Sequence, residues 1–323
     1  MLRAIQEIEP FVGDTPLRKM KVPGVNLFAK LEYNNFSGSI KDRAALNILA
    51  NAARSGELHE GSFVVESSSG NFAVALMSIC NLLGLKFIAV IDPNINSAYE
   101  ELLRISCEVV KVTELDHTGG YLLNRIRKVK EICASDTNAY WPNQYSNPQN
   151  YLSYYNGLGK EICASFEQLD YLFIAVSSCG TITGTSKRIK EQFPHIKVIA
   201  VDVEGSVIFS NEPAKRFVSG IGASKVPDIL KEAHVDDVIH VSHLELIQGC
   251  RELLSEQSVF AGASSGACYY AVKNHFKAAS GSENALFICP DKGYPYLNTI
   301  YNDQWVSEMT PTFNNLKIAL PVS

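Results

Sequence analysis

The sequence predicts an α/β fold in which helices cover both faces of parallel sheets. Three observations lead to this prediction. Short β-rich runs alternate with helical patterns along most of the 323 residues. Small residues and hydroxyls follow the apolar runs, where the carboxyl ends of parallel strands would lie. The composition, 46% hydrophobic and 20% charged, is that of a globular chain with room for two modest domains or one large one. Strands that alternate with helices favour parallel sheets.

The first half of the chain supplies four of the predicted strands. NLFAKLEY, residues 26–33, has the β-rich composition of a strand, and a helical pattern starts at about Lys41. The elements that follow are a strand over 62–67, a helix over 70–84, a strand over 86–92, a helix over 97–106 and a strand over 107–112.

The second half repeats this alternation after an interruption. Residues 140–159, YWPNQYSNPQNYLSYYNGLG, are rich in Asn, Pro and Tyr and form the best candidate for a junction between domains. Beyond them we predict a strand over 170–177, a helix over 183–193 and strands over 195–202 and 285–291.

Charge and cysteine content narrow the class of protein. A formal net charge of -5 and a pI near 5.8 give no electrostatic footprint for nucleic acid or an anionic membrane, so we expect small-molecule or protein partners. The eight cysteines form no C-x-x-C pair, which predicts buried, reduced thiols. The N-terminal stretch MLRAIQEIEPF lacks the apolar core of a signal peptide, so we expect a cytoplasmic protein. We expect no metal site, because the one close histidine pair, His240 and His243, lacks further ligands at suitable spacing.

The stretch SSCGTITG, residues 177–184, follows an apolar strand and opens a helix. Free backbone N–H groups and the helix dipole favour a phosphate there, and the hydroxyls of Ser177, Ser178 and Thr181 add hydrogen-bond donors. A dinucleotide unit is an alternative, because Asp202 lies at a suitable distance, but Gly180 and Gly184 do not complete G-x-G-x-x-G. A plain helix start is the other alternative.

Three further turns carry groups that suit a phosphorylated heteroaromatic ligand. SSSGNFAVAL, residues 67–76, could hold a carboxylate through N–H groups and hydroxyls, and Asn71 could donate to a ring oxygen. GASSGA, residues 262–267, could place a serine hydroxyl against a ring nitrogen, or could be only a helix cap. In SGSIKDR, Lys41 stands at the start of a predicted helix. At this position the local sequence does not distinguish an ordinary surface charge from a lysine that acts in covalent catalysis.

Taken in order, these stretches resemble the fold-type II pyridoxal-phosphate enzymes of the cysteine synthase and cystathionine β-synthase family. The resemblance runs from VGDTPL at residues 12–17, through KLEYNNFSGSIKDR, to PDKGYPYL at residues 290–297. It implies two open twisted sheets, mostly parallel and each covered by helices. It also implies a smaller mobile substrate-binding domain over 40–145, a larger cofactor-binding domain from 1–39 plus 146–323, and a homodimer.

The resemblance assigns roles to residues at matching positions. Lys41 would hold pyridoxal 5'-phosphate covalently, Asn71 would bond its phenolic oxygen, and Ser264 would face its pyridine nitrogen. The residues that would hold its phosphate are Ser177, Ser178, Cys179, Gly180 and Thr181. The residues that would bind substrate are Ser68, Ser69, Gly70, Gln144, Arg125, Tyr145 and Gly220.

One branch of the family fits more closely, the N-(2-amino-2-carboxyethyl)-L-glutamate synthases of siderophore and antibiotic precursor pathways. The matching stretches are HTGGYLLNRIRKV, WPNQYSNP, VDVEGSVIF and GIGASKVPDIL. The phosphate and substrate loops depart from the usual family pattern, and Phe72 places the common cysteine synthase specificity in question. Arg216 and Lys225, on either side of GIGA, could close over the acceptor.

The implied chemistry is β-replacement, in which the neutral amine of Lys41 takes and returns the α-proton of the donor amino acid. The donor would be O-phospho-L-serine and the acceptor L-glutamate. A cysteine synthase, which joins O-acetylserine or O-phosphoserine to sulfide, is the alternative within the family. A nicotinamide-dependent oxidoreductase that uses Gly180 and Asp202, and a catalytically inactive regulatory relative, are the alternatives outside this chemistry.

Overall fold

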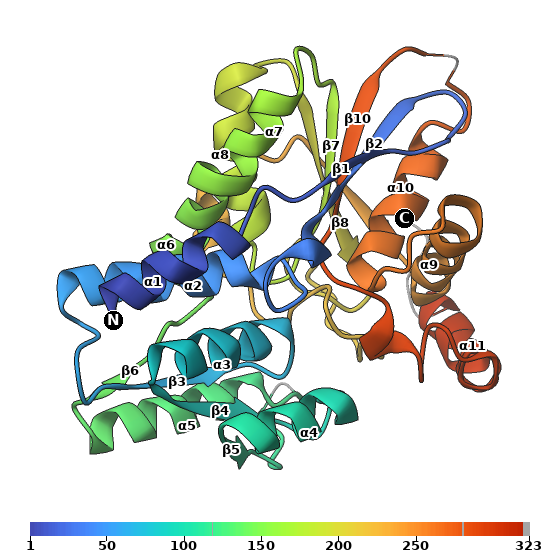
Figure 1. The fold of residues 1–323 in the computed structure, drawn as a ribbon. Coiled ribbons are helices and arrows are strands. Elements are labelled where there is room, and N and C mark those ends of the chain that lie inside the picture. Colours follow the sequence, from blue (N-terminus) through green and yellow to red (C-terminus); the bar gives the residue numbers. More distant parts are fainter. Residues whose placement is uncertain (118, 280, 319–323) are drawn as a thin grey trace.

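Two separate sheets organise the chain in a computed structural model that describes residues 1–117, 119–279 and 281–318 (Figure 1). The larger sheet has six strands in the order β1-β2-β10-β7-β8-β9, and only β1 runs antiparallel to its neighbour. Its strands are β1 (Leu17–Lys19), β2 (Asn26–Leu31), β7 (Tyr171–Ala175), β8 (Lys197–Val203), β9 (Asp237–Val241) and β10 (Asn284–Cys289).

The smaller sheet has four parallel strands in the order β5-β4-β3-β6. Its strands are β3 (Phe63–Ser67), β4 (Lys86–Ile91), β5 (Glu108–Lys111) and β6 (Ala139–Tyr140). Residues 63–140 therefore supply this whole sheet, while residues 17–31 and 171–289 supply the larger one. The predicted strands are confirmed to within a few residues at their ends.

Helices cover both faces of each sheet, as the alternating pattern predicts (Figure 1). The α-helices are α1 (Leu2–Ile8), α2 (Lys41–Ser55), α3 (Asn71–Leu83), α4 (Ser97–Ser106), α5 (Leu122–Ser135), α6 (Pro148–Ser153), α7 (Lys160–Ser165), α8 (Gly180–Gln192), α9 (His243–Gln257), α10 (Ala263–His275) and α11 (Asp303–Ile318). The short helices are η1 (Glu9–Phe11), η2 (Glu32–Asn34), the π-helix η3 (Tyr154–Gly159), η4 (Asp228–Glu232) and η5 (Tyr294–Tyr296).

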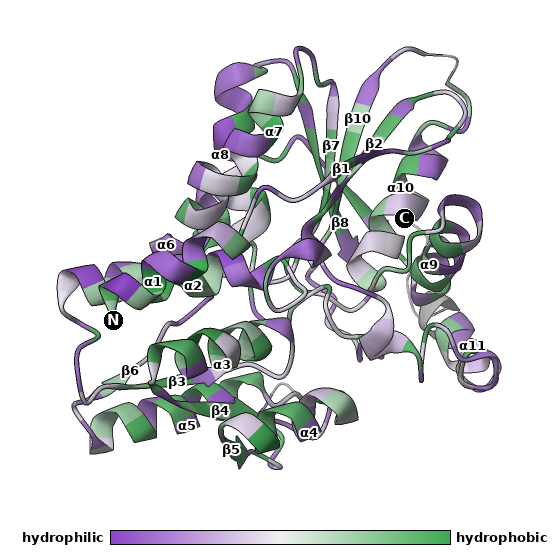
Figure 2. Cartoon of the chain, viewed as in Figure 1, coloured by the Kyte–Doolittle hydropathy of each residue, from purple (hydrophilic) through white to green (hydrophobic). Residues whose placement is uncertain are grey.

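Consecutive residues of the central strands enter different hydrophobic clusters. In β3, Val64 packs on the side of α3 and Val65 on the side of α5, where it meets Val129. In β10, Leu286 and Phe287 divide between the two faces of the larger sheet in the same way. Figure 2 shows apolar residues concentrated in the strands and in α3. Burial on both faces of a sheet requires the near-continuous apolar runs seen in these strands.

The predicted junction over 140–159 is mostly helical. Asn147 caps α6 by accepting from the Gln149 N–H at 2.9 Å, and Pro148 occupies the first turn, where a missing N–H costs nothing. The chain then continues through η3, where Tyr154 is fully buried. Because α2 packs on both α3 and α6, one contiguous core joins the two halves, and the domain boundaries stay a prediction.

Other expectations concern thiols and membranes. All eight cysteines are free, and most are buried. Among the described residues, no helix combines the length and the apolar character needed to cross a bilayer.

Candidate active site

Lys41 is the first residue of α2 and reaches a cavity between the two sheets. Its loop folds back on the helix start, because Asp42 accepts from the Ser37 N–H at 2.7 Å and from the Ser37 hydroxyl. The loop is also tied to the end of β10, where the Ile40 N–H donates to the Pro290 carbonyl at 2.8 Å. Burial lowers the pKa of the Lys41 amine, although the nearby Asp291 carboxylate opposes this. A neutral amine can act as nucleophile and as base.

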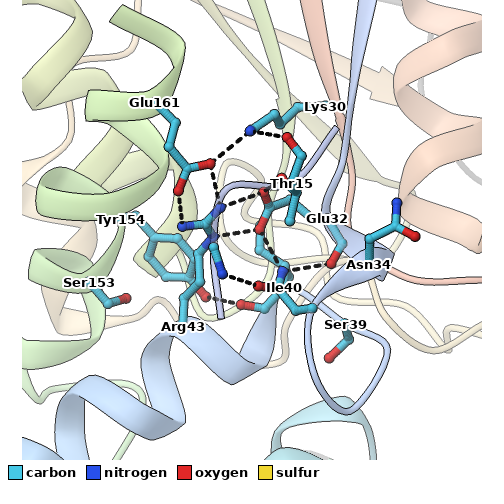
Figure 3. A network of polar contacts seen from close by, with 12 residues as sticks. Thr15, Lys30, Glu32, Asn34, Ser39, Ile40, Arg43, Ser153, Tyr154 and Glu161 are labelled. Atoms are coloured by element: carbon cyan, nitrogen blue, oxygen red, sulfur yellow. Dashed lines mark hydrogen bonds and ion pairs between the residues drawn. The ribbon is translucent and has the colours of Figure 1, made fainter. Parts of the chain in front are cut away.

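A buried network of charges anchors α2 behind Lys41 (Figure 3). The Arg43 guanidinium donates to Glu32 at 2.6 and 2.8 Å and to Glu161 at 2.6 and 2.9 Å. Lys30 of β2 also pairs with Glu161, at 2.7 Å. The first turn of α2 is therefore fixed to β2, η2 and α7.

The loop between β7 and α8 forms the part of the cavity where a phosphate is predicted to bind. Ser177, Ser178, Cys179 and Thr181 line the cavity at the N-terminus of this 13-residue helix, where N–H groups lack intrahelical partners. Gly180 does not line it. A Cβ at Gly180 would lie 2.1 Å from Oδ1 of Asn150, so only glycine allows this approach. Cys179 adopts a left-handed backbone with φ 63°, which turns the chain into the helix.

Asn71 and Asp291 meet beside Lys41. The Asn71 amide donates to Oδ2 of Asp291 at 2.7 Å and accepts from the Tyr99 hydroxyl. The Tyr296 hydroxyl donates to the same Asp291 oxygen at 2.9 Å. Burial raises the pKa of Asp291, and the Lys41 charge counteracts this. Sequence reasoning missed Asp291, although an acid directly after the apolar strand β10 was a signal that could have identified it.

The loop after β3 contains the serines that are predicted to bind a carboxylate. Ser68 accepts from the Ala73 N–H at 3.2 Å, and Ser69 contacts both Asp92 and Arg125, at 3.1 and 2.7 Å. Arg125 also forms an ion pair with Asp92 at 3.1 Å. The charge of Arg125 is therefore already compensated by Asp92, and its predicted contact with substrate stays a prediction.

Glu66 lies buried beneath two loops of the site. Its carboxylate accepts from the Ser67 N–H at 2.7 Å and from the Trp141 indole at 3.2 Å, and the amides of Asn143 and Gln144 also face it. Burial raises the pKa of Glu66 to about 7. Glu66 was not predicted as a site residue, because it lies in a strand whose neighbouring residues are mostly apolar.

The structure brings nearly all predicted site residues to one cavity of about 200 Å³. Every one of them except Gly180 lines it, from both sheets: Lys41, Ser68, Ser69, Gly70, Asn71, Arg125, Gln144, Tyr145, Ser177, Ser178, Cys179, Thr181, Gly220 and Ser264. Lys225 lines neither this cavity nor the adjoining one, whereas Arg216 lines the adjoining one. This set of groups fits a phosphorylated pyridine aldehyde. The buried amine of Lys41 suits the aldehyde, the helix N-terminus with its hydroxyls suits the phosphate, and the polar side chains of Asn71 and Ser264 suit the ring.

Known proteins are similar to this chain in sequence and in fold. Residues 8–291 match the family described as pyridoxal-phosphate dependent enzyme. An N-(2-amino-2-carboxyethyl)-L-glutamate synthase of Ralstonia nicotianae is 40% identical over 304 residues, which are 92% of this chain and 90% of that protein.

Solved structures agree with the predicted fold class. An O-acetylserine dependent cystathionine β-synthase from Helicobacter pylori matches with a TM-score of 0.85 and 28% identity, over 91% of this chain and 98% of that one. An O-ureido-L-serine synthase matches with a TM-score of 0.84 and 26% identity, over 93% and 98% of the two chains. The prediction of an α/β fold with two mostly parallel, helix-covered sheets is confirmed.

Proposed function

This chain belongs to the pyridoxal-phosphate dependent enzyme family, and we propose that it joins O-phospho-L-serine to L-glutamate by β-replacement. The products are N-(2-amino-2-carboxyethyl)-L-glutamate and phosphate. The observation that carries the proposal is the 40% identity, over 92% of the chain, to a synthase named for this product. The cavity adds support, because it gathers hydroxyls and helix N–H groups that suit two anionic substrates.

Pyridoxal phosphate, when bound, stabilises negative charge at the α-carbon of an amino acid and so makes the β-substituent easier to expel. We assign its covalent attachment to Lys41 and its phosphate to the loop from Ser177 to Thr181. Asn71 is placed to bond the phenolic oxygen and Ser264 to face the pyridine nitrogen. An uncharged serine leaves that nitrogen without a carboxylate partner, which favours β-elimination over transamination.

The chain's own groups bind and orient the donor and move its proton. Ser68, Ser69 and the Gly70 N–H suit the α-carboxylate, and Gln144, which lines the same cavity, is a further candidate for binding the substrate. Tyr145 is a candidate for binding the phosphate of the donor. The Lys41 amine removes the α-proton and later returns it, and its lowered pKa supports both roles.

Atoms and charges balance in this replacement. The Cβ–O bond of the donor breaks, and phosphate leaves with the electron pair. A Cβ–N bond forms to the amine of glutamate, and the proton that this amine loses ends on the phosphate that has left. The α-proton that Lys41 removed returns to the same carbon.

The proposal extends to the whole molecule. We propose a cytoplasmic homodimer whose domain over 40–145 moves against the domain from 1–39 plus 146–323 when substrate binds. We place its product in the synthesis of 2,3-diaminopropionate for siderophores or antibiotics. The family resemblance supports these statements.

The deciding experiment incubates the cofactor-loaded enzyme with O-phosphoserine and glutamate, and measures phosphate release and adduct mass. We expect equal amounts of phosphate and adduct. A parallel reaction offers O-acetylserine or O-phosphoserine with sulfide, because one of the similar structures is an O-acetylserine dependent enzyme. Much faster cysteine formation, with no glutamate adduct, would identify a cysteine synthase instead.

A further inference from the structure

A second cavity, of about 400 Å³, adjoins the one that holds Lys41. The two share Ser69, Arg125, Tyr145, Ser219 and Gly220, so the outer cavity opens directly onto the inner one. The rest of the outer wall comes largely from the loop over residues 215–224. A second substrate that reaches the donor from solvent through this opening would pass along this loop.

Arg216 is the half-buried cation of this wall whose hydrogen bonds, among the described residues, go to neutral groups. Its guanidinium donates to the Gly205 carbonyl at 3.2 Å and to the Ser224 hydroxyl at 3.0 Å. Within residues 1–117, 119–279 and 281–318, no carboxylate lies within ion-pair distance of it. Asp202 acts on it only from farther away, and burial lowers the pKa of Arg216.

The other charged groups of the outer cavity are engaged differently. Arg125 is neutralised by Asp92, which is also the lining carboxylate. The Lys215 ammonium lies over the Phe217 ring, 5.1 Å from its centroid, on an exposed side chain. Arg216 is thus the half-buried cation with bonding capacity left for an anion.

The backbone at Gly222 leaves room for this arginine. Gly222 has φ +74°, and a Cβ there would meet Cδ of Arg216 at 3.0 Å and the Val203 side chain at 2.9 Å. A side chain at this position would therefore crowd the arginine. Arginine binds carboxylates through two parallel hydrogen bonds, which gives orientation as well as affinity.

We infer that the outer cavity is the acceptor site and that Arg216 binds a carboxylate of a dicarboxylic amino acid. The inference rests on the proposed function, since the acceptor's amine must reach into the inner cavity while its carboxylates remain in the outer one. Arg216 is on this view a specificity-determining residue, which selects glutamate over acceptors without a second carboxylate.

Glutarate, which has two carboxylates and no amine to react, tests binding directly. Calorimetric titration of the cofactor-loaded enzyme should show glutarate binding that Arg216→Gln weakens at least tenfold and that Arg216→Lys weakens less. Lys225→Gln is the matched control, because it removes a nearby charge that lines neither cavity, and it should bind glutarate as the unmodified protein does.

Kinetics separate this inference from the proposed function. Arg216→Gln should raise KM for glutamate at least tenfold with a smaller change in kcat, and Arg216→Lys should raise KM less than Arg216→Gln does. An unmodified enzyme that forms no adduct with glutamate overturns the proposed function and the acceptor site together. An active enzyme whose Arg216→Gln variant keeps its glutarate affinity and glutamate KM overturns the acceptor site alone.

Discussion

At the scale of single residues, the site depends on groups whose pKa values are shifted by burial. Lys41 and Asp291 lie near each other, and burial disfavours the charged form of each, while their mutual attraction favours it. The position of Asn71 between Asp291 and Tyr99 orients its amide. These residues come from α2, α3, α4 and the end of β10, so the sequence does not show their proximity.

The first prediction concerns Lys41. We expect Lys41→Ala to abolish covalent attachment of pyridoxal phosphate, because no other lysine is among the described residues that line the inner cavity. Borohydride reduction followed by peptide mass spectrometry should find the cofactor on the peptide that contains Lys41 and nowhere else. Lys128→Ala, which removes an exposed lysine of α5, is the control and should keep the modification. Cofactor bound covalently to the Lys41→Ala protein would contradict the assignment.

Glu66 gives a prediction about pH. Its pKa of about 7 in the folded protein exceeds the ordinary 4.5, so the folded state binds the extra proton between these values. Stability from this group is then present below pH 4.5 and lost as pH rises through 7. The groups facing it, Cys133, Tyr140 and Tyr145, include no cation that would reverse this sign.

Glu66→Gln removes the titration while keeping the shape of the side chain. Relative to the unmodified protein, the free energy of unfolding of this variant should rise by about 3 kcal/mol between pH 4.5 and pH 8. Urea unfolding at the two pH values measures the difference. A stability difference that does not change with pH would show that Glu66 titrates normally.

At the scale of elements, helix starts and strand ends build the site. Lys41 lies at the N-terminus of α2, Asn71 at that of α3, and the predicted phosphate site at that of α8. Each of these helices follows a loop of small residues. The Arg43 network anchors the first turn of α2 (Figure 3), so the position of Lys41, two residues earlier, depends on these charges.

Arg43→Met tests this anchoring. The substitution leaves the fully buried Glu32 without its cation, which should lower the free energy of unfolding by about 3–5 kcal/mol and weaken cofactor binding. Arg54→Met, on the same helix, breaks an exposed pair with Glu9 and should cost at most about 1 kcal/mol. Urea unfolding and cofactor titration measure both effects, and equal losses in the two variants would argue against a special role for Arg43.

At the scale of the whole molecule, local patterns predicted the elements well and their contacts less well. Alternating apolar runs gave the strands, and the ordered motifs gave the family, whose match over residues 8–291 confirms the resemblance. Asp291, Glu66 and the Arg125–Asp92 pair were not predicted, because each depends on segments that fold together from distant parts of the chain. The periodicity of apolar residues predicts which side chains are buried, but it does not predict which buried polar groups contact each other.

The fluorescence of Trp141 can report the proposed movement of the domain over 40–145. The chain has two tryptophans, and Trp141 donates to Glu66 beneath the substrate loops, whereas Trp305 lies in α11, against Phe313. Closure around a donor should shift the loop that carries Trp141 and change its emission. With O-phosphoserine added to the cofactor-loaded enzyme, the Trp305→Phe variant should keep the fluorescence change and the Trp141→Phe variant should lose it. A change that follows Trp305 instead, or none in either variant, would argue against closure of this part of the chain.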